Sequence, residues 1–434
     1  MKSLRQYSSV LFLCSIMSFP RSFLMAKLVC LAIFVLVHTI DFRWNSRVRV
    51  HSRIVIFYCL VAVGGLIWSL VGLAGTGDPA GVFDNLRLYG AWSLAYLLIL
   101  TLLRNDDGLR HIHSAIVLSG LLIGAVNFIG IYDQYFELGI FSQSVQEELR
   151  LAIGFHEGYV QITSHNIGSL LFITPYLLAI QFLRNTSQVN GGLTKLSLVV
   201  CLLVSILSGR RALWLCVVLT PLIVGILAVA SSTVQMVKPG ARKLIAAMGC
   251  GVVFASIVMI ASRNQPGEVG IAAIDHLSAA FSAEDERSIQ SGYLLSGFAD
   301  NPILGSGFGS YAGYLRSDDR PWMYELTYFQ LLFNCGIVGI LYWGLLFGSY
   351  LFLACRVIRE NRDSNGQPLA LIVGMCTILV GAHSNPYLAS FDFLIFVAIL
   401  PFVASLQEVR PVENDDNAAL TVDVKRLEVL RIGA

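Results

Sequence analysis

The chain has 434 residues, of which 56% are hydrophobic and 13% are charged, and its mean hydropathy is +0.69. Charged residues make up about a quarter of a typical soluble domain, so this composition excludes an ordinary soluble protein. The formal net charge of +2 identifies no charged partner, and the distribution of the charges along the chain is more informative than their sum. Repeated apolar stretches of about 18 to 22 residues, each ending in charged or turn residues, predict a polytopic helical membrane protein.

The apolar stretches predict an all-α fold with about 12 transmembrane helices. Their approximate ranges are 8–20, 23–40, 54–75, 88–103, 112–131, 166–183, 194–208, 212–231, 243–262, 325–353, 369–387 and 389–406. Lys2 and Arg5 precede the first stretch, as they would in a signal peptide. Because Phe19-Pro-Arg21 offers no small-residue cleavage site, we expect a retained helix there.

The distribution of positive charge predicts the orientation. If the N-terminus is cytoplasmic, most of the 30 lysine and arginine residues fall in cytoplasmic segments, as the positive-inside rule requires. Both termini are then cytoplasmic, and one large extracytoplasmic loop lies between spans 9 and 10. The predicted organisation is 1–262 for the first nine spans, 263–324 for the loop, 325–406 for the last three spans, and 407–434 for a cytoplasmic tail.

The large loop is the longest polar interval and the expected place for a site. Ser282-Ala-Glu-Asp285 is typical of a helix start, and a helix from about 283 to 299 would carry Arg287. Asp300-Asn-Pro302 would end this helix, and Gly305-Ser-Gly-Phe-Gly309 predicts a flexible approach to the next span. The glycine spacing is not a dinucleotide-binding fingerprint, because it follows no βα unit.

Arg210 and Arg211 are the most informative cations, because they lie between two apolar spans in Leu207-Ser-Gly-Arg-Arg-Ala-Leu-Trp214. Charge at this position is costly unless an anion matches it. The planar guanidinium fork suits phosphate or pyrophosphate, to which it makes bidentate charge-assisted hydrogen bonds. The alternative is a short outer turn with solvated arginines.

Two further residues carry competing interpretations. Arg287 is either an anion-binding residue or a surface cation that pairs with Glu284 or Asp285 at helical spacing. Glu325 begins an apolar span, so it either interacts with the helix dipole or acts as a general base at the membrane interface. No two of the outer histidines show metal-ligand spacing, and no two of the nine cysteines form a Cys-x-x-Cys pair, so no metal site is expected.

Three stretches of the chain, in this order, resemble a known family. They are Ser208-Gly-Arg-Arg-Ala-Leu-Trp214, then Arg287 followed by Asn301-Pro-Ile-Leu-Gly-Ser-Gly-Phe-Gly309, then Tyr324-Glu-Leu-Thr-Tyr-Phe-Gln330 with Gly336 and Gly339. They are similar to the Ser-Gly-x-Arg-Gly/Ala-x-Trp, the Arg…Asn-Pro-Leu-x-Gly-x-Gly and the His-Asn-x-Tyr-x-Gln…Gly-x-x-Gly segments of the O-antigen polymerase/O-antigen ligase superfamily of bacterial membrane glycosyltransferases. A fainter match runs from Arg150 to Asn166, so the resemblance covers roughly residues 150–345.

The resemblance implies a C-type, metal-independent and inverting glycosyltransferase that needs no cofactor. Its donor and acceptor would be polyprenyl-pyrophosphate-linked glycans. The resemblance also implies that the enzyme is embedded in the lipid bilayer and that a chain-length regulator protein can be its partner. No nucleic acid is expected as a partner. The implied location is the bacterial inner membrane, with the active site facing the periplasm.

The resemblance also assigns roles. The histidine that serves as the proposed base of the ligases corresponds to Glu325 here, and the following asparagine to Leu326, which favours a polymerase of O-antigen, capsule or exopolysaccharide repeats. Glu325 would be the base, and Arg211 and Arg287 would stabilise the leaving pyrophosphate. The remaining expected substrate-binding residues are Arg210, Arg150, Asn166, Arg316, Arg320 and Tyr328.

Two alternatives remain at this point. A ligase would transfer a finished glycan to a lipid or protein acceptor, with an outer histidine such as His383 as the base. A carrier for a neutral or lipid-linked substrate would form no glycosidic bond. The predicted span centres contain almost none of the charged residues that ion-coupled carriers commonly use.

Overall fold

The computed structural model describes residues 2–45, 50–104, 107–156, 159–184, 186, 191–250, 286–314, 318–361 and 366–406. Most of them are helical, as the sequence predicts. The α-helices include α1 (Lys2–Ser18), α2 (Leu24–Asn45), α3 (Ser52–Ala74), α4 (Pro79–Leu86), α5 (Trp92–Leu103), α6 (Gly108–Phe136), α7 (Gln143–Leu149), α8 (Leu170–Phe182), α9 (Gly192–Leu207), α10 (Arg211–Ala230), α13 (Glu286–Asp300), α14 (Thr327–Glu360), α15 (Gln367–Gly381) and α16 (Phe391–Ala404), and residues 239–250 are also helical. Short π- or 3₁₀-helical turns are η1 (Arg87–Ala91), η2 (His165–Ser169), η3 (Val234–Met236), η4 (Ala382–Ser384) and η5 (Tyr387–Ala389).

One β-hairpin interrupts the helical pattern, which the predicted all-α class did not include. Strand β1 (Ala152–His156) pairs antiparallel with β2 (Tyr159–Thr163). The two segments are rich in β-branched and aromatic residues, which favour strands over helices. The hairpin lies between the predicted spans 112–131 and 166–183, where an acidic outer loop was expected.

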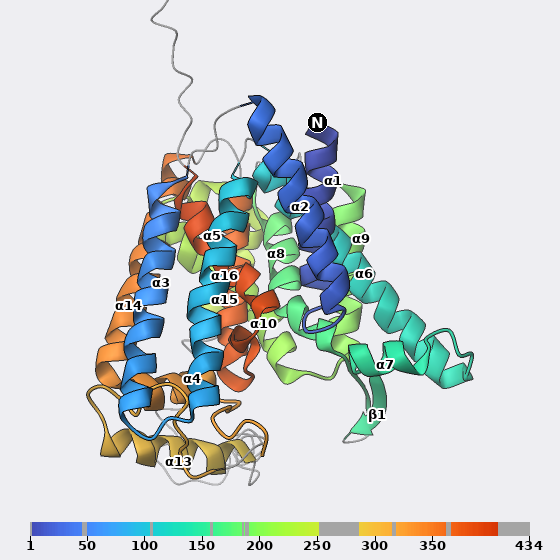
Figure 1. Cartoon of the computed structure of the whole chain (residues 1–434). Helices are drawn as coiled ribbons and strands as arrows, with labels where there is room; N and C mark the ends of the chain where they lie inside the picture. The colour runs from blue at the N-terminus through green and yellow to red at the C-terminus, as the bar shows by residue number, and fades with distance from the viewer. Residues whose placement is uncertain are drawn as a thin grey trace, which may run out of the picture.

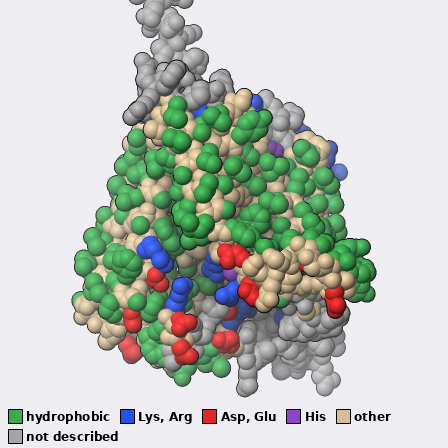
Figure 2. Space-filling model, turned by 45° about the vertical axis from the view of Figure 1, so that its right-hand side comes forward, with side chains coloured by type: hydrophobic (Ala, Val, Ile, Leu, Met, Phe, Trp, Pro, Cys, Tyr) green, Lys and Arg blue, Asp and Glu red, His purple; other side chains and the backbone are tan. Residues whose placement is uncertain are grey.

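Within the described residues, five helical stretches are long and apolar enough to cross a membrane, namely Ser52–Ala74, Pro79–Leu103, Gly108–Phe136, Arg211–Ala230 and Thr327–Glu360. The second comprises α4, η1 and α5, so helix already begins between the predicted spans 54–75 and 88–103, where a short outer connection was expected. The other predicted spans stay predictions, and most of the ninth, 243–262, lies outside the described residues. Leu345 and Phe352 of α14 are 72% and 69% exposed. Figure 2 shows a broad hydrophobic surface of this kind, which suits contact with lipid.

The centre of the bundle is formed by α8, α15 and α16, which pack against one another and are enclosed by the other long helices (Figure 1). Every residue of α8 from Leu170 to Leu177 is buried, and Phe172 of α8 stacks on Phe396 of α16. These helices are apolar on all sides because they face protein in every direction.

The connections α4, α7, β1 and α13 gather at one end of the bundle, opposite the N-terminus (Figure 1). We call this the loop end and define it as residues 19–23, 75–91, 137–156, 159–169, 208–211, 286–314, 318–327 and 382–390. Contacts across it join segments that are far apart in the chain. Ser22 Oγ donates to the backbone oxygen of Glu148 at 2.7 Å, and Thr327 Oγ1 donates to that of Asn385 at 3.3 Å.

The glycine-rich segment 305–309 is a fixed part of the fold, which corrects its expected flexibility. Helix α14 is broken at Gly336, which has φ 61°, and the backbone nitrogen of Ile337 there donates to the oxygen of Pro302 at 2.9 Å. Gly307 donates in turn to the oxygen of Asn334 at 2.8 Å. A Cβ atom at Gly336 would lie 2.4 Å from the oxygen of Ile303, so only glycine permits this close approach. The motif therefore docks the loop into the break of α14.

Candidate functional site at the loop end

Arg287 and Glu325 meet at the loop end, although 38 positions separate them in the chain. Arg287 Nε lies 2.9 Å from Glu325 Oε2, and the two side chains are 42% and 20% exposed. The surface-cation interpretation paired Arg287 with Glu284 or Asp285, which lie outside the described residues. The contact with Glu325 is made across the loop, and it brings two predicted catalytic residues together.

Gln290 holds this pair in place. It lies one turn after Arg287 on α13, is 1% exposed, and its Oε1 accepts from the backbone nitrogens of Glu325 and Leu326 at 2.8 and 3.1 Å. Helix α14 begins at Thr327 rather than at 325, so Glu325 lies in the approach to the helix. The two bonds satisfy backbone nitrogens that α14 leaves without an intrahelical partner, and they hold Glu325 beside α13, where its carboxyl contacts Arg287.

The segment from Ser205 to Trp214 shapes the turn between α9 and α10. Ser208 Oγ accepts from the backbone nitrogen of Arg210 at 3.3 Å, and Gly209 has φ 62°. Trp214 Nε1 donates to the oxygen of Ser205 at 2.9 Å, which ties the start of α10 to the end of α9. The serine, glycine and tryptophan of this motif thus have structural roles, and they place the two arginines at the loop end.

The two arginines of that turn have different surroundings. Arg210 is half-buried, and its Nη1 donates to Tyr387 Oη at 3.1 Å. Arg211 is the first residue of α10 and is exposed. Tyr387 on η5 therefore orients Arg210, and the side chain of Arg211 is exposed at the start of α10.

A histidine lies among three arginines on the same end of the bundle. Burial lowers the pKa of His165, the positive charges of Arg150, Arg21 and Arg210 lower it further, and Glu148 opposes them. We call Arg21, Arg150 and Arg210 the arginine cluster. Figure 2 shows basic side chains and a histidine, with acidic side chains between and around them, below the hydrophobic surface.

The other predicted site residues are dispersed. Asn166 is fully buried, and its Oδ1 accepts from Asn127 and Ser164 at 3.0 and 2.5 Å. Arg320 is exposed in the segment before α14, and Arg316 lies outside the described residues. Tyr328 Oη donates to the oxygen of Leu379 at 2.5 Å.

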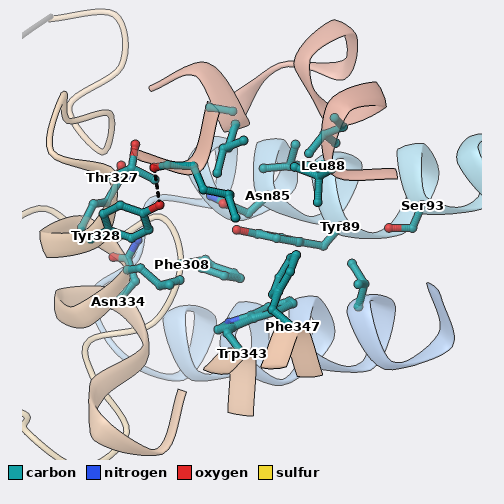
Figure 3. A pocket seen from close by; sticks show the side chains of 18 of the residues that line it. Asn85, Leu88, Tyr89, Ser93, Phe308, Thr327, Tyr328, Asn334, Trp343 and Phe347 are labelled. Carbon is teal, nitrogen blue, oxygen red and sulfur yellow. Dashed lines mark hydrogen bonds between the residues drawn. The ribbon is translucent and has the colours of Figure 1, made fainter. Parts of the chain in front are cut away.

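An apolar cavity of about 410 Å³ lies beside the site, between α3, η1, α5, α14 and α16. Figure 3 shows Thr327 and Tyr328 at one end of it and Ser93 at the other, with the rings of Tyr89, Phe308 and Trp343 between them. Pro386 of the turn between η4 and η5 also lines it. The cavity suits an apolar chain, and its Thr327 end is two residues from Glu325.

Several residues with a part in this arrangement were not predicted. Arg21 and His165 lie at the ends of apolar stretches, and neither their spacing nor a motif marks them as site residues. Gln290 is visible on the Arg287 face of the predicted helix, but only the fold shows that it binds the backbone of Glu325. Lys27 and Asp392, which form a buried ion pair at 2.6 Å, were detectable as charges inside or beside predicted spans.

Comparison with the models of known protein families finds no match, and comparison with curated proteins finds no relative of this chain.

Proposed function

We propose that the protein is a polysaccharide polymerase that joins polyprenyl-pyrophosphate-linked oligosaccharide repeats at the periplasmic face of the bacterial inner membrane. The observation that carries the proposal is the contact between Arg287 and Glu325 at 2.9 Å, formed at the loop end of a bundle with membrane-length helices. The arginine cluster and the apolar cavity beside the pair support it, because a lipid pyrophosphate presents both a polyanion and an apolar chain.

In the proposed reaction, Glu325 removes the proton from a sugar hydroxyl of the acceptor. The hydroxyl oxygen attacks the anomeric carbon of the donor, and the bond from that carbon to the pyrophosphate oxygen breaks. A single displacement of this kind inverts the anomeric configuration. General-base assistance of this type is worth about 10²- to 10⁴-fold in rate.

Negative charge develops on the pyrophosphate as it leaves, and fixed arginines at the loop end would stabilise it. Arg211 is exposed at the start of α10 and is our first candidate for this role. Arg287 would both orient Glu325 and contribute positive charge. Removing one such donor is expected to lower the rate by about 10²- to 10³-fold.

The test is an assay with purified protein and a polyprenyl-pyrophosphate oligosaccharide repeat as donor and acceptor, with products separated by size. A ladder that Glu325→Gln and Arg211→Ala both remove is the expected result. Product that forms only after a separate lipid or protein acceptor is added would replace the polymerase by a ligase. Binding of the lipid-linked glycan without any glycosidic product in either arm would replace both by a carrier.

One observation favours the ligase as second candidate. The ring of His383 stacks on that of Tyr328 with centroids 6.1 Å apart, and it is also 6.1 Å from the ring of Phe329. A histidine is therefore close to the start of α14, where the Glu325 site lies. Loss of activity in His383→Gln with retention in Glu325→Gln would support a ligase with His383 as its base.

A further inference from the structure

Two arginines from different connections close the end of α16, at the end of the bundle opposite the loop end (Figure 1). Arg53 Nη1 donates to the oxygen of Ala404 at 2.6 Å, and Arg104 Nη2 donates to the oxygen of Ser405 at 3.0 Å. Arg53 lies in the first turn of α3, and Arg104 follows the last residue of α5. Because the two acceptors are consecutive residues, the packing of three helices brings two guanidinium groups together.

Both arginines are held through the backbone as well as through the side chain. His51 Nδ1 accepts from the backbone nitrogen of Arg53 at 3.2 Å, and Tyr350 Oη of α14 donates to the backbone oxygen of Arg53. The backbone nitrogen of Arg104 donates to the oxygen of Leu100 at 3.0 Å. Both arginines are half-buried. Groups whose positions are already fixed lose little conformational freedom when a ligand binds.

The positive charge of this pair is not matched by the described residues. None of the ion pairs formed by them includes Arg53 or Arg104, whereas Arg356 of α14 lies 2.8 Å from Glu360. Burial lowers the pKa of Arg104, and the positive charge of Arg53 lowers it further. The C-terminus of a helix carries only about half a unit of negative charge, so α16 compensates a fraction of two positive charges. The excess favours an anion at this place.

The two side chains keep hydrogen-bond donors for such an anion. A guanidinium group has several N–H donors in a planar fork, and Arg53 and Arg104 each use one nitrogen on an oxygen at the end of α16. The remaining donors match the oxygens of a phosphate group, to which arginine makes charge-assisted hydrogen bonds. A phosphate group therefore fits the pair in both charge and geometry.

An exposed apolar stripe begins at Arg53 and runs along α3. Ile56, Leu60, Val63 and Ile67 follow at spacings of three and four residues, and all four are exposed. Residues at this spacing share one face of a helix, and α3 is long enough to cross a membrane. Helix α5 packs beside α3 (Figure 1). A phosphate held by Arg53 would consequently lie at the end of a surface that suits lipid chains.

We propose that Arg53 and Arg104 bind the phosphate group of an anionic phospholipid, whose acyl chains lie along the exposed stripe of α3. Basic side chains between helices at the cytoplasmic surface attract anionic head groups, because that leaflet carries negative charge. The orientation proposed above places this end of the bundle in the cytoplasm. The lipid would join the start of α3 and the end of α5 to the end of α16, and its binding does not depend on any enzymatic activity.

The experiment uses the full-length protein in nanodiscs of phosphatidylcholine, with and without phosphatidylglycerol. Thermal unfolding gives the increase in Tm that phosphatidylglycerol causes, and native mass spectrometry of the detergent-solubilised protein gives its Kd. The variants are Arg53→Gln, Arg104→Gln and their combination. Arg356→Gln is the matched control, because this arginine lies at the same end and is paired with Glu360. Thr101→Glu adds a carboxylate three residues before Arg104 and leaves both arginines in place.

Phosphatidylglycerol should raise the Tm of the natural protein, because a ligand of the folded state stabilises it. Each glutamine variant should bind phosphatidylglycerol about fivefold more weakly, and the double variant about 25-fold more weakly. Arg356→Gln should change the Kd by less than about twofold. Thr101→Glu should weaken binding about as much as one glutamine variant, and it tests the charge without removing a bond to α16. High ionic strength should also weaken binding.

A purely structural role of the arginines would lower the Tm equally in both kinds of nanodisc and leave the increase caused by phosphatidylglycerol intact. That result in the folded variants would overturn the proposal, as would an equal loss of binding in Arg356→Gln. Inorganic phosphate that competes as well as phosphatidylglycerol would show a site for a soluble anion instead. The outcome is independent of the polymerase assay, since lipid binding at this end can be retained whether or not polymer forms.

Discussion

The two polar groups at the loop end are built in opposite ways. Arg287 and Glu325 neutralise each other at 2.9 Å, and both come from the segment that the glycine-rich motif docks against α14. The arginine cluster collects like charges from three separate connections on the turn between η4 and η5 and around His165. A matched pair suits the transfer of a proton, whereas convergent cations suit the binding of an anion. This difference predicts that catalysis and binding of the donor can be impaired separately.

The largest expected effect is on catalysis. Glu325→Gln keeps the size of the side chain and removes its basicity, so polymer formation should fall by about 10²- to 10⁴-fold while the binding of geranyl pyrophosphate, a short analogue of the proposed lipid donor, stays unchanged. Rates come from the product ladder and affinities from equilibrium binding of geranyl pyrophosphate to the protein in nanodiscs. Glu286→Gln is the matched control, since Glu286 lies beside Arg287 but accepts from Tyr314 Oη at 2.8 Å. Near-normal polymer length in Glu325→Gln would remove the carboxylate from the mechanism.

The next effect concerns the frame of the Arg287–Glu325 pair. Gly336→Ala would put a Cβ atom 2.4 Å from the oxygen of Ile303 at a residue with φ 61°, so the loss of stability should be about 1–3 kcal/mol or more. Polymer formation should fall along with the stability, and binding by the arginine cluster should change less. Thermal unfolding in detergent measures the loss of stability.

Gly344→Ala is the control for this substitution, because nothing lies within 4 Å of a Cβ atom there and the residue belongs to the same helix. If the two variants unfold at the same temperature, the docking of the loop does not depend on the break at Gly336.

A smaller effect tests how the arginine cluster is oriented. Tyr387→Phe removes the hydroxyl that accepts from Arg210, so geranyl pyrophosphate should bind about two- to tenfold more weakly. Because Tyr387 acts through Arg210, the KM of the polymerisation should rise and kcat should stay unchanged. Tyr314→Phe serves as the control, since its hydroxyl contacts α13 instead. An effect on kcat alone would place Tyr387 in the catalytic step rather than in binding.

The smallest effect is a dependence on pH. Burial and the charges of Arg150, Arg21 and Arg210 lower the pKa of His165 below its usual value, against the opposing effect of Glu148, so the ring is neutral at pH 7. A bound pyrophosphate would raise the pKa of His165. The affinity for geranyl pyrophosphate should therefore increase, by less than about tenfold, as the pH falls towards the pKa of His165 in the free protein. His165→Gln should lose this increase and retain only the titration of the ligand. An identical pH profile in the two proteins would show that His165 does not sense the ligand.

The sequence by itself determined that the protein is largely helical, with apolar helices long enough to cross a membrane. Hydropathy and charge indicate membrane-length helices, because lipid requires long apolar segments with internally bonded backbones. The same reasoning placed Arg287 on a helix and Arg210 and Arg211 in a short turn between two helices. It did not reveal the β-hairpin 152–163, since short alternating segments are ambiguous between strand and loop.

Only the tertiary structure decided which charged residues meet. The contact between Arg287 and Glu325, the buried ion pair of Lys27 with Asp392, and the place of Arg21 beside Arg210 all join segments that no local pattern connects. The local sequence likewise predicts a flexible linker at the glycines of 305–309. In the structure this segment is hydrogen-bonded into the break of α14 at Gly336. The physical reason is that propensity and periodicity act over a few residues. Ion pairs and close backbone approaches depend on the distance in space, which is fixed only when the helices pack.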